Sequence, residues 1–401
     1  MKVAITDLFR DHFDEYRSRH GLRLEEHRAA KAIMQCRSDR LGRYEQRCDN
    51  GHVAFEGFHS CHHRSCPSCN GHAREDWLVR VQSKLLPVPH FHVVFTLPHE
   101  LSDLWRHNRV WFSDQLFRIC AESLRAMLRD PRHLGAEPAM LLAQHTWGRT
   151  LVFHPHIHAL VTAGGLGGTQ WKASRTGYLV PGRALSALYR AKWMSALNQA
   201  LAAGDLQRPN AMSEPAVRTI LKAIARKRWH VRIQGSYDHG AGVAIYLSRY
   251  VRGGPIHDRR AIEVTTQGVR FTYLDHRDQR TKPLTLSRDA FMGRVLSHVP
   301  PERRHLIRYF GLYHAKATER LTLARSQLAP AWRPPAKRVT EPALCSDCQA
   351  PLRVIHYRRD GNSQIRSERS ARRYAQPRVQ ANAPPLVLAG QAHETGPPHF
   401  F

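Results

Sequence analysis

The feature that most constrains the fold of this 401-residue chain is a block dense in cysteine and histidine, between Cys36 and His72. At its centre, the spacing Cys61-x4-Cys66-x2-Cys69 includes a Cys-Pro-Ser-Cys turn, which brings two thiolates to about 2.3 Å from one tetrahedral Zn²⁺. The block has few apolar residues for a core of its own, so we expect metal binding to hold it folded. The predicted zinc ligands are Cys36, Cys48, Cys61, Cys66 and Cys69.

The number of zinc ions in this block stays open. The segment after Cys48 reads Cys-Asp-Asn-Gly-His and has no second cysteine, so His52 is a candidate substitute ligand. His62, His63 and His72 are further candidates, although a surface position is the more ordinary role for such histidines.

A second cysteine pair lies near the C-terminus, at Cys345 and Cys348. The pair is half of a zinc knuckle, and no completing pair follows it, so a bound ion would need His356 or an external partner. We interpret it as a degenerate half-site. Cys120 lies in an apolar helical pattern and is expected to be a packed core thiol.

The charge of the chain limits its partners. Lys and Arg number 61 against 33 Asp and Glu, a formal charge of +28. This excess favours nucleic acid, because neutralised phosphates release their counterions. No segment reaches the ~18 apolar residues of a membrane span, and residues 1–10 do not resemble a secretion signal. We therefore expect a cytoplasmic protein with no membrane partner and no small-molecule substrate, whose eight cysteines bind metal rather than form disulfides.

The order of the elements predicts an α+β fold. Apolar periodicity and Pro/Gly boundaries predict helices and strands that alternate irregularly along the chain. The predicted helices are 8–33, 73–86, 101–130, 183–203, 215–228, 241–252 and 287–298. The predicted strands are 90–97, 151–163, 229–234, 262–266 and 269–273. The predicted domains are a helix with a zinc module (1–86), a catalytic domain (87–325) and a Pro/Arg-rich basic tail (326–401), disordered from residue 358.

A histidine pair occurs within the strand predicted at 151–163. In a strand, residues i and i+2 share a face, so His156 and His158 can direct both imidazoles at one divalent ion. By itself the pattern is weak in a chain with 27 histidines. The alternative is a pair that is solvated or satisfied in the core.

A tyrosine pair occurs in the sequence Ala-Ile-Tyr-Leu-Ser-Arg-Tyr-Val-Arg. Tyr246 and Tyr250 are spaced i, i+4, which places both phenols on one face of a helix. Arg249 and Arg252 beside them are suited to bind the phosphates of a DNA strand. The alternative is that both tyrosines simply pack against a core.

Taken together, several separated blocks make the chain resemble the insertion-sequence transposases of the rolling-circle, two-tyrosine HUH family, which carry an N-terminal zinc-binding domain. The resemblance covers roughly residues 30–315 and depends on the order and spacing of the blocks. The blocks are residues 60–69, 89–101, 145–151, 154–158, 246–251 and 306–312.

The resemblance implies an HUH-endonuclease-like antiparallel sheet flanked by helices. It also implies that His156 and His158 hold Mg²⁺ or Mn²⁺, and that Tyr246 or Tyr250 attacks DNA to leave a 5′-phosphotyrosine. Which tyrosine acts first stays open. For the third metal ligand His92 and His154 are candidates, and the role of His145 is not assigned.

The partners implied by the resemblance are single-stranded or hairpin DNA at transposon ends, and target DNA, in the nucleoid of a bacterial cytoplasm. Each step is a transesterification, and the chain has no Walker A motif, so we expect no nucleotide cofactor. Two alternatives remain. One is a relaxase or replication initiator with the same chemistry, and the other is a non-catalytic zinc-dependent DNA-binding regulator derived from a transposase.

Overall fold

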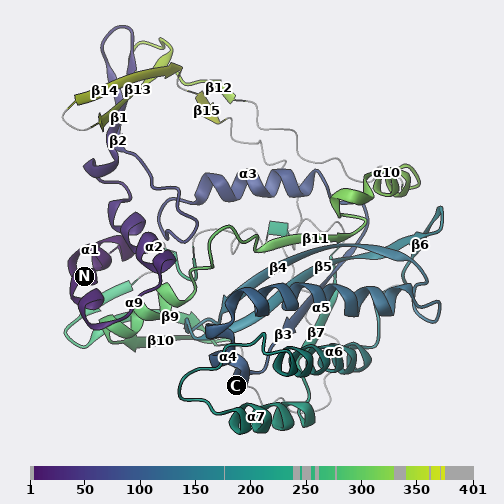
Figure 1. Ribbon diagram of the computed structural model, residues 1–401. Helices are drawn as coiled ribbons and strands as arrows, with labels where there is room; N and C mark the ends of the chain where they lie inside the picture. The colour runs from purple at the N-terminus through teal and green to yellow at the C-terminus, as the bar shows by residue number, and fades with distance from the viewer. Residues whose placement is uncertain are drawn as a thin grey trace. The chain divides into compact units, whose positions relative to one another are not determined.

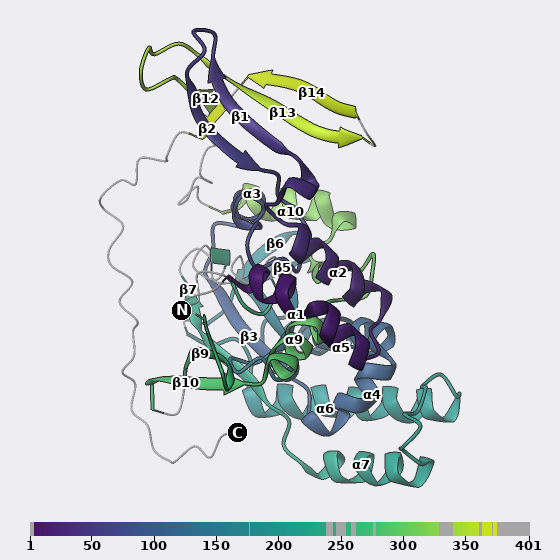
Figure 2. The same cartoon turned by 90° about the vertical axis from the view of Figure 1, so that its left-hand side faces the viewer.

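The structure is a computed structural model that describes residues 4–175, 177–237, 244–245, 254–257, 262–275, 278–328, 340–360, 363–370 and 372–374. Contacts along the chain divide it into two compact units (Figures 1 and 2). The first unit comprises residues 1–36, 61–271 and 284–335, and the second comprises residues 37–60, 272–283 and 336–401. The second unit therefore combines three segments that are far apart in sequence.

All α-helices among the described residues belong to the first unit. They are α1 (Ile5–Arg19), α2 (Leu24–Gln35), α3 (Gly71–Gln82), α4 (Ser102–His107), α5 (Arg109–Arg129), α6 (Gly182–Ala202), α7 (Glu214–Arg226), α9 (Arg288–Ser297) and α10 (Thr318–Ser326). The single helix predicted at 8–33 is wrong, because a short non-helical segment containing Gly21 separates α1 from α2. No helix among the described residues is long and apolar enough to cross a membrane.

An antiparallel sheet forms the centre of the first unit, in the order β11-β4-β5-β3-β7, with β6 added to β5. Its strands are β3 (His90–Thr96), β4 (Glu137–Trp147), β5 (Phe153–Gly167), β6 (Gln170–Ala173), β7 (Val231–Tyr237) and β11 (Ile307–Gly311). Strands β3, β5 and β7 overlap the predicted segments 90–97, 151–163 and 229–234, whereas β4, β6 and β11 are not predicted. The α+β class is confirmed.

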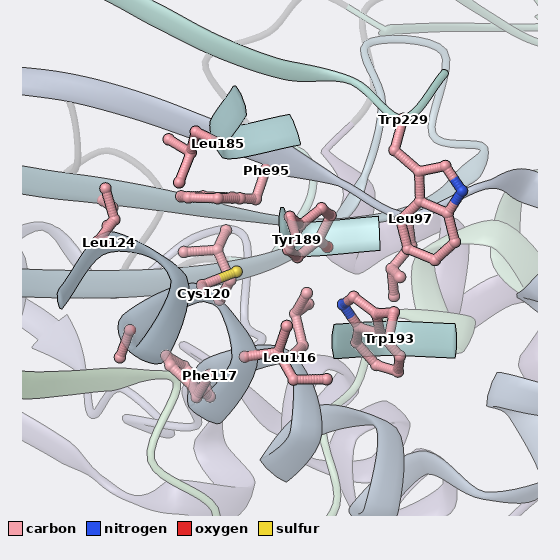
Figure 3. Packing of buried hydrophobic residues seen from close by; sticks show 14 of the residues in the cluster. Phe95, Leu97, Leu116, Phe117, Cys120, Leu124, Leu185, Tyr189, Trp193 and Trp229 are labelled. Carbon is pink, nitrogen blue, oxygen red and sulfur yellow. The ribbon is translucent and has the colours of Figure 1, made fainter. Parts of the chain in front are cut away.

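One face of this sheet carries the main hydrophobic core. Ile157 and Ala159 on β5 point to this face together with Phe95 on β3, and helices α5, α6 and α7 cover it (Figure 1). Figure 3 shows Tyr189 and Trp193 of α6 packed among Phe95, Leu116 and Cys120. Cys120 is fully buried here, as a core thiol would be.

The opposite face carries a second cluster, to which α3 and α10 contribute. Leu141 and Ala143 on β4 and Leu160 on β5 pack there with Leu86 and Ala324. Ala244 is also buried in this cluster. Because side chains alternate along a strand, His145, His156 and His158 lie on this face rather than on the α5–α6 face.

A third cluster joins α1, α2 and α9 to a small sheet of β8 (Ile262–Thr265), β9 (Gly268–Leu274) and β10 (Thr281–Leu286). The predicted hairpin at 262–273 is the pair β8–β9. Helix α9 begins after Ser287, whose hydroxyl accepts a hydrogen bond from the backbone N–H of Ala290. Four cysteines of the N-terminal block lie in this cluster.

The second unit contains a sheet in the order β14-β13-β1-β2, all antiparallel, and a two-stranded pair β12–β15. Its strands are β1 (Arg43–Cys48), β2 (Val53–Phe58), β12 (Thr340–Pro342), β13 (Leu352–Asp360), β14 (Ser363–Ser370) and β15 (Arg372–Tyr374). Figure 2 shows β13 and β14 beside the β1–β2 hairpin. The disorder predicted from residue 358 is therefore wrong for the last three residues of β13 and for β14 and β15, where backbone pairing orders a polar segment. The remainder of that prediction concerns residues outside the described ones.

Candidate metal centres

Three histidines from two neighbouring strands converge on one face of the central sheet. His156 and His158 lie on β5, and His145 lies on β4 directly opposite His156. One nitrogen from each of the three rings lies within 4.8 Å of the other two. The i, i+2 spacing on a strand puts the first two together, and the pairing register of β4 adds the third.

The hydrogen bonds of this cluster fix which nitrogens carry lone pairs. His156 Nδ1 lies 2.7 Å from the carbonyl oxygen of His154, which can only accept, so Nδ1–H donates and Nε2 is left with its lone pair. His92 Nδ1 likewise donates to Gln234 Oε1 at 2.9 Å, so His92 Nε2 accepts. His92 Nε2 accepts a hydrogen bond from His158 Nδ1 at 2.8 Å, so the lone pair of His158 is on its Nε2 atom. The two Nε2 atoms, of His156 and His158, lie 3.0 Å apart.

The cluster is also held neutral. Burial, and then the charge of His154, lower the pKa of His156 to about 3. Burial, and then the neighbouring histidines, place the pKa values of His145 and His158 well below the usual range. Neutral imidazoles are the form that coordinates a metal ion, and the crowding of three such rings is what a shared cation would relieve.

The two histidines considered for the third ligand lie elsewhere. His92 contacts His158 from β3 and orients it, which is an outer-shell position. His154 offers its backbone carbonyl to His156 and is not part of the three-histidine group. The residue that completes the group is His145, which sequence spacing did not assign.

Four cysteines form a separate cluster in the first unit. Cys36, at the end of α2, meets Cys61, Cys66 and Cys69 of the loop before α3, with all four sulfurs within 4.8 Å. Cys61 Sγ lies 3.7 Å from Cys69 Sγ. Buried Asn70 donates to the carbonyls of His63 and Cys66 and so fixes the loop.

The thiols of this cluster are close enough to affect one another's ionisation. Hydrogen bonds with the other three cysteines lower the pKa of Cys36, whereas hydrogen bonds with the other cysteines and burial raise the pKa of Cys66. Four sulfurs at this spacing have the composition of a structural Zn²⁺ site, in which the metal deprotonates every ligand.

The fifth predicted zinc ligand, Cys48, does not join this group. It lies at the end of β1 in the second unit, in a cluster with His52, Cys345 and Cys348. His356, considered as a partner for the C-terminal pair, instead stacks on His59, with ring centroids 5.1 Å apart.

Comparison with known proteins supplies the family. Residues 139–320 match a family model described as a putative transposase, and residues 8–97 match a transposase zinc-binding domain. The chain is 38% identical over 316 residues to the putative transposase y4qJ of Sinorhizobium fredii, covering 77% of this chain and 79% of that protein. It is 33% identical over 356 residues to the transposase for insertion sequence element IS801 of Pseudomonas savastanoi pv. phaseolicola, covering 83% and 84%. No solved structure matches the chain.

The chain belongs to the rolling-circle insertion-sequence transposases with an N-terminal zinc-binding domain. The predicted family membership is therefore confirmed. The zinc-binding domain of this transposase contains the cluster of Cys36, Cys61, Cys66 and Cys69, which supports Zn²⁺ as a constituent of the protein. The alternative of a relaxase or replication initiator finds no support, because the matched relatives are transposases.

The predicted nucleophiles of the transposase lie outside the described residues. These are Tyr246 and Tyr250, with the phosphate-binding candidates Arg249 and Arg252. Two described residues flank this segment in sequence. Ala244 before it is buried on the histidine face of the sheet, and Gly254 after it lies close to the backbone of Ser65. A Cβ on Gly254 would meet Ser65 O at 2.9 Å.

Proposed function

We propose that this transposase cleaves and rejoins single-stranded DNA at its element ends through a 5′-phosphotyrosine, with His145, His156 and His158 holding Mg²⁺ or Mn²⁺. The single observation that carries the proposal is the arrangement of His156 and His158. Nδ1 of each ring is engaged by a hydrogen bond, to the carbonyl of His154 and to His92, and the two Nε2 atoms lie 3.0 Å apart.

One nitrogen of each of the three rings lies within 4.8 Å of the other two, so the three imidazoles could hold one divalent ion between them. Three imidazoles favour Mn²⁺ over Mg²⁺, because imidazole is a softer ligand than the oxygens that Mg²⁺ prefers.

An ion held by these three histidines would keep positions open for oxygen ligands from DNA. When bound, the divalent ion would polarise the scissile phosphate and stabilise its developing charge. The neutral, buried histidines supply no negative charge of their own, so they leave the cation strongly attractive to a phosphate. This is the charge balance that a phosphodiester substrate requires.

The proposed nucleophile is Tyr246 or Tyr250. Ala244 is buried on the histidine face of the sheet, and Tyr246 follows it by only two residues, a reach of at most about 8 Å between Cα atoms. This connectivity supports a tyrosine beside the histidine cluster. Arg249 and Arg252 would then bind phosphates that flank the scissile bond.

The proposed step exchanges one phosphorus–oxygen bond for another. The tyrosine oxygen forms a bond to phosphorus while the bond from phosphorus to the 3′ oxygen breaks. The phenol proton is lost, and the 3′ oxygen leaves as a hydroxyl after taking up a proton. The covalent 5′-phosphotyrosine can then be attacked by another 3′-hydroxyl, which rejoins DNA without a nucleotide cofactor. A second tyrosine would allow a further transfer before the first bond is resolved.

The test uses the full chain with labelled single-stranded ends of its own element and Mn²⁺ or Mg²⁺. Denaturing gels should show a covalent adduct linked to the DNA 5′ end. At least one of Tyr246→Phe and Tyr250→Phe should lose the adduct, and the double variant must lose it entirely. Phenylalanine keeps the ring packing, so the loss would report the oxygen alone.

The matched control is Tyr178→Phe, which removes the phenol oxygen of an exposed tyrosine that is far from Tyr246 and Tyr250 in sequence. It should form the adduct as the unmodified chain does. A double Tyr246→Phe, Tyr250→Phe variant that still forms a 5′-linked adduct would falsify the mechanism. An unmodified chain that binds the ends without any adduct would favour the non-catalytic regulator.

A further inference from the structure

A second four-ligand cluster lies in the second unit and combines two residues of the matched zinc-binding domain (residues 8–97) with two that lie beyond it. It consists of Cys48, His52, Cys345 and Cys348, with one ligand atom from each within 4.8 Å of the other three. Cys348 and Cys48 are 300 positions apart in sequence. The two halves therefore come from opposite ends of the chain.

The distances in this cluster have the dimensions of a tetrahedral metal site. Cys348 Sγ lies 3.7 Å from Cys48 Sγ, and Cys345 Sγ lies 3.7 Å from His52 Nδ1. Two thiolates at about 2.3 Å from one Zn²⁺ lie roughly 3.8 Å apart at the tetrahedral angle. A disulfide would instead require a sulfur–sulfur distance of about 2.05 Å.

Backbone hydrogen bonds build each half of the cluster as a tight turn. Between β1 and β2, Gly51 N–H donates to Cys48 O at 3.0 Å, and Cys48 N–H donates to His52 O at 3.1 Å. Before β13, Gln349 N–H donates to Cys345 O at 3.0 Å, and Cys345 N–H donates to Ala350 O at 2.9 Å. The backbone hydrogen bonds of each turn hold two ligands close together, which lowers the ordering cost of coordination.

The sheet register brings the two turns together. Strand β1 pairs with β13 so that Cys48 stands opposite Leu352. The second turn therefore ends beside the first. The apolar cluster at this end is small, with Cys48, Ala343, Cys345 and Leu352 as its buried members. Such a cluster contributes little to stability by itself, as in other small modules that depend on a metal.

We propose that Cys48, His52, Cys345 and Cys348 bind a second structural zinc ion, which fastens the C-terminal strand β13 to the β1–β2 hairpin. The transposase then holds two zinc ions of different ligand sets. The first has four sulfurs, and the second has three sulfurs and one nitrogen. The C-terminal cysteine pair is half of a complete site rather than a degenerate remnant, because its missing half lies in the N-terminal block.

Metal analysis of the full-length protein tests the proposal directly. The unmodified chain should hold two zinc ions per molecule, and the double variant Cys345→Ser, Cys348→Ser should hold one. Cys66→Ser together with Cys69→Ser should also leave one, because it removes the other site. Cys120→Ala is the matched control, since it removes a buried thiol from the core and should keep both ions.

Cobalt substitution separates the two ligand sets even if the cysteine variants fold poorly. With both sites loaded by Co²⁺, His52→Cys should shift the visible d–d bands of one ion toward the spectrum of a four-sulfur site, with two ions retained. His52→Ala should lower the affinity of the protein for one of the two ions at least tenfold, as measured by chelator competition. These changes depend on His52 acting as a ligand and not on activity.

Three results would overturn the proposal. The first is a single zinc ion in the unmodified chain under reducing conditions. The second is two ions retained by the Cys345→Ser, Cys348→Ser variant. The third is a mass two hydrogens below that of the reduced chain, with a peptide linking Cys48 to Cys348, which would identify a disulfide instead.

Discussion

His92 Nε2 lies 2.8 Å from Nδ1 of His158, and this contact decides which nitrogen of His158 can bind a metal ion. The orientation begins one strand away, where the amide oxygen of Gln234 accepts from His92 Nδ1. Each hydrogen bond fixes the tautomer of the next ring, so β7 and β3 together prepare a ligand on β5. His92 is therefore a positioning residue.

Replacement of His92 should weaken metal binding without removing a ligand. We expect His92→Phe to lower the Mn²⁺ affinity of the chain roughly 10–100-fold, the usual effect of losing an outer-shell partner. Titration followed by the EPR signal of free Mn²⁺ measures it, and cleavage should recover at high Mn²⁺ concentration. His99→Phe, at a highly exposed ring, should change nothing. An unchanged Mn²⁺ affinity in His92→Phe would contradict the positioning role.

His145 should behave differently from His92, because it is proposed to touch the ion. We expect His145→Ala to abolish cleavage, and saturating Mn²⁺ should not restore the activity fully. The double variant His156→Ala, His158→Ala and EDTA treatment of the unmodified chain should do the same. DNA affinity should fall by less than about tenfold in each case, because most of the binding energy comes from phosphate contacts elsewhere. Gel cleavage and fluorescence anisotropy on the same DNA separate the two effects.

The sequence predicts the strand that carries His156 and His158, because the i, i+2 rule acts within one segment. It does not predict His145 as their neighbour, since that depends on the register between β4 and β5, and β4 itself is not predicted. Register is set by tertiary packing of both faces of the sheet. The same limit applies to Cys48 and Cys348, which pairing of β1 with β13 brings together. The strand β14 is missed because its polar composition resembles a disordered tail.

His298 gives the stability a dependence on pH. Burial is the main reason that its pKa falls from 6.5 to about 4, while Nε2 hydrogen-bonds the carbonyl of Leu151 at 3.0 Å. The unfolded chain binds a proton near pH 6.5 and the folded chain does not, so stability is complete above that pH and declines toward pH 4. The loss from this group is about 3 kcal/mol.

Urea unfolding of the unmodified chain and of His298→Gln measures this contribution. Glutamine can keep a donor toward Leu151 and does not titrate. We expect the difference in unfolding free energy between the two proteins to shrink or reverse between pH 6.5 and pH 4.5, since other histidines affect both equally. A difference that stays constant over this range would show that His298 does not titrate with folding.

Gly311, at the end of β11, tests how closely the sheet edge is packed. Its φ is +58°, and a Cβ there would lie 1.9 Å from the carbonyl oxygen of Pro138 on β4. Gly311→Ala should therefore lower the unfolding free energy by roughly 1–3 kcal/mol. Gly182→Ala, where a Cβ would meet nothing within 4 Å, is the control and should be neutral or slightly stabilising. Thermal unfolding of the two variants and of the unmodified chain measures these differences in stability.

The charge of +28 should make the DNA affinity of the transposase strongly dependent on salt. If about 6–10 phosphates are contacted, affinity should fall by roughly 10³–10⁵ between 50 and 200 mM salt. The decline on single strands should be somewhat shallower than on duplex, since single strands hold fewer condensed counterions. At equal salt, we expect single-stranded or hairpin ends to bind more tightly than duplex of the same sequence, because the proposed nucleophile acts on an exposed phosphodiester. Anisotropy titrations with matched oligonucleotides measure both quantities. A flat salt response would exclude the electrostatic part, whereas equal affinity for duplex and single strand would exclude the substrate preference and leave the chemistry untouched.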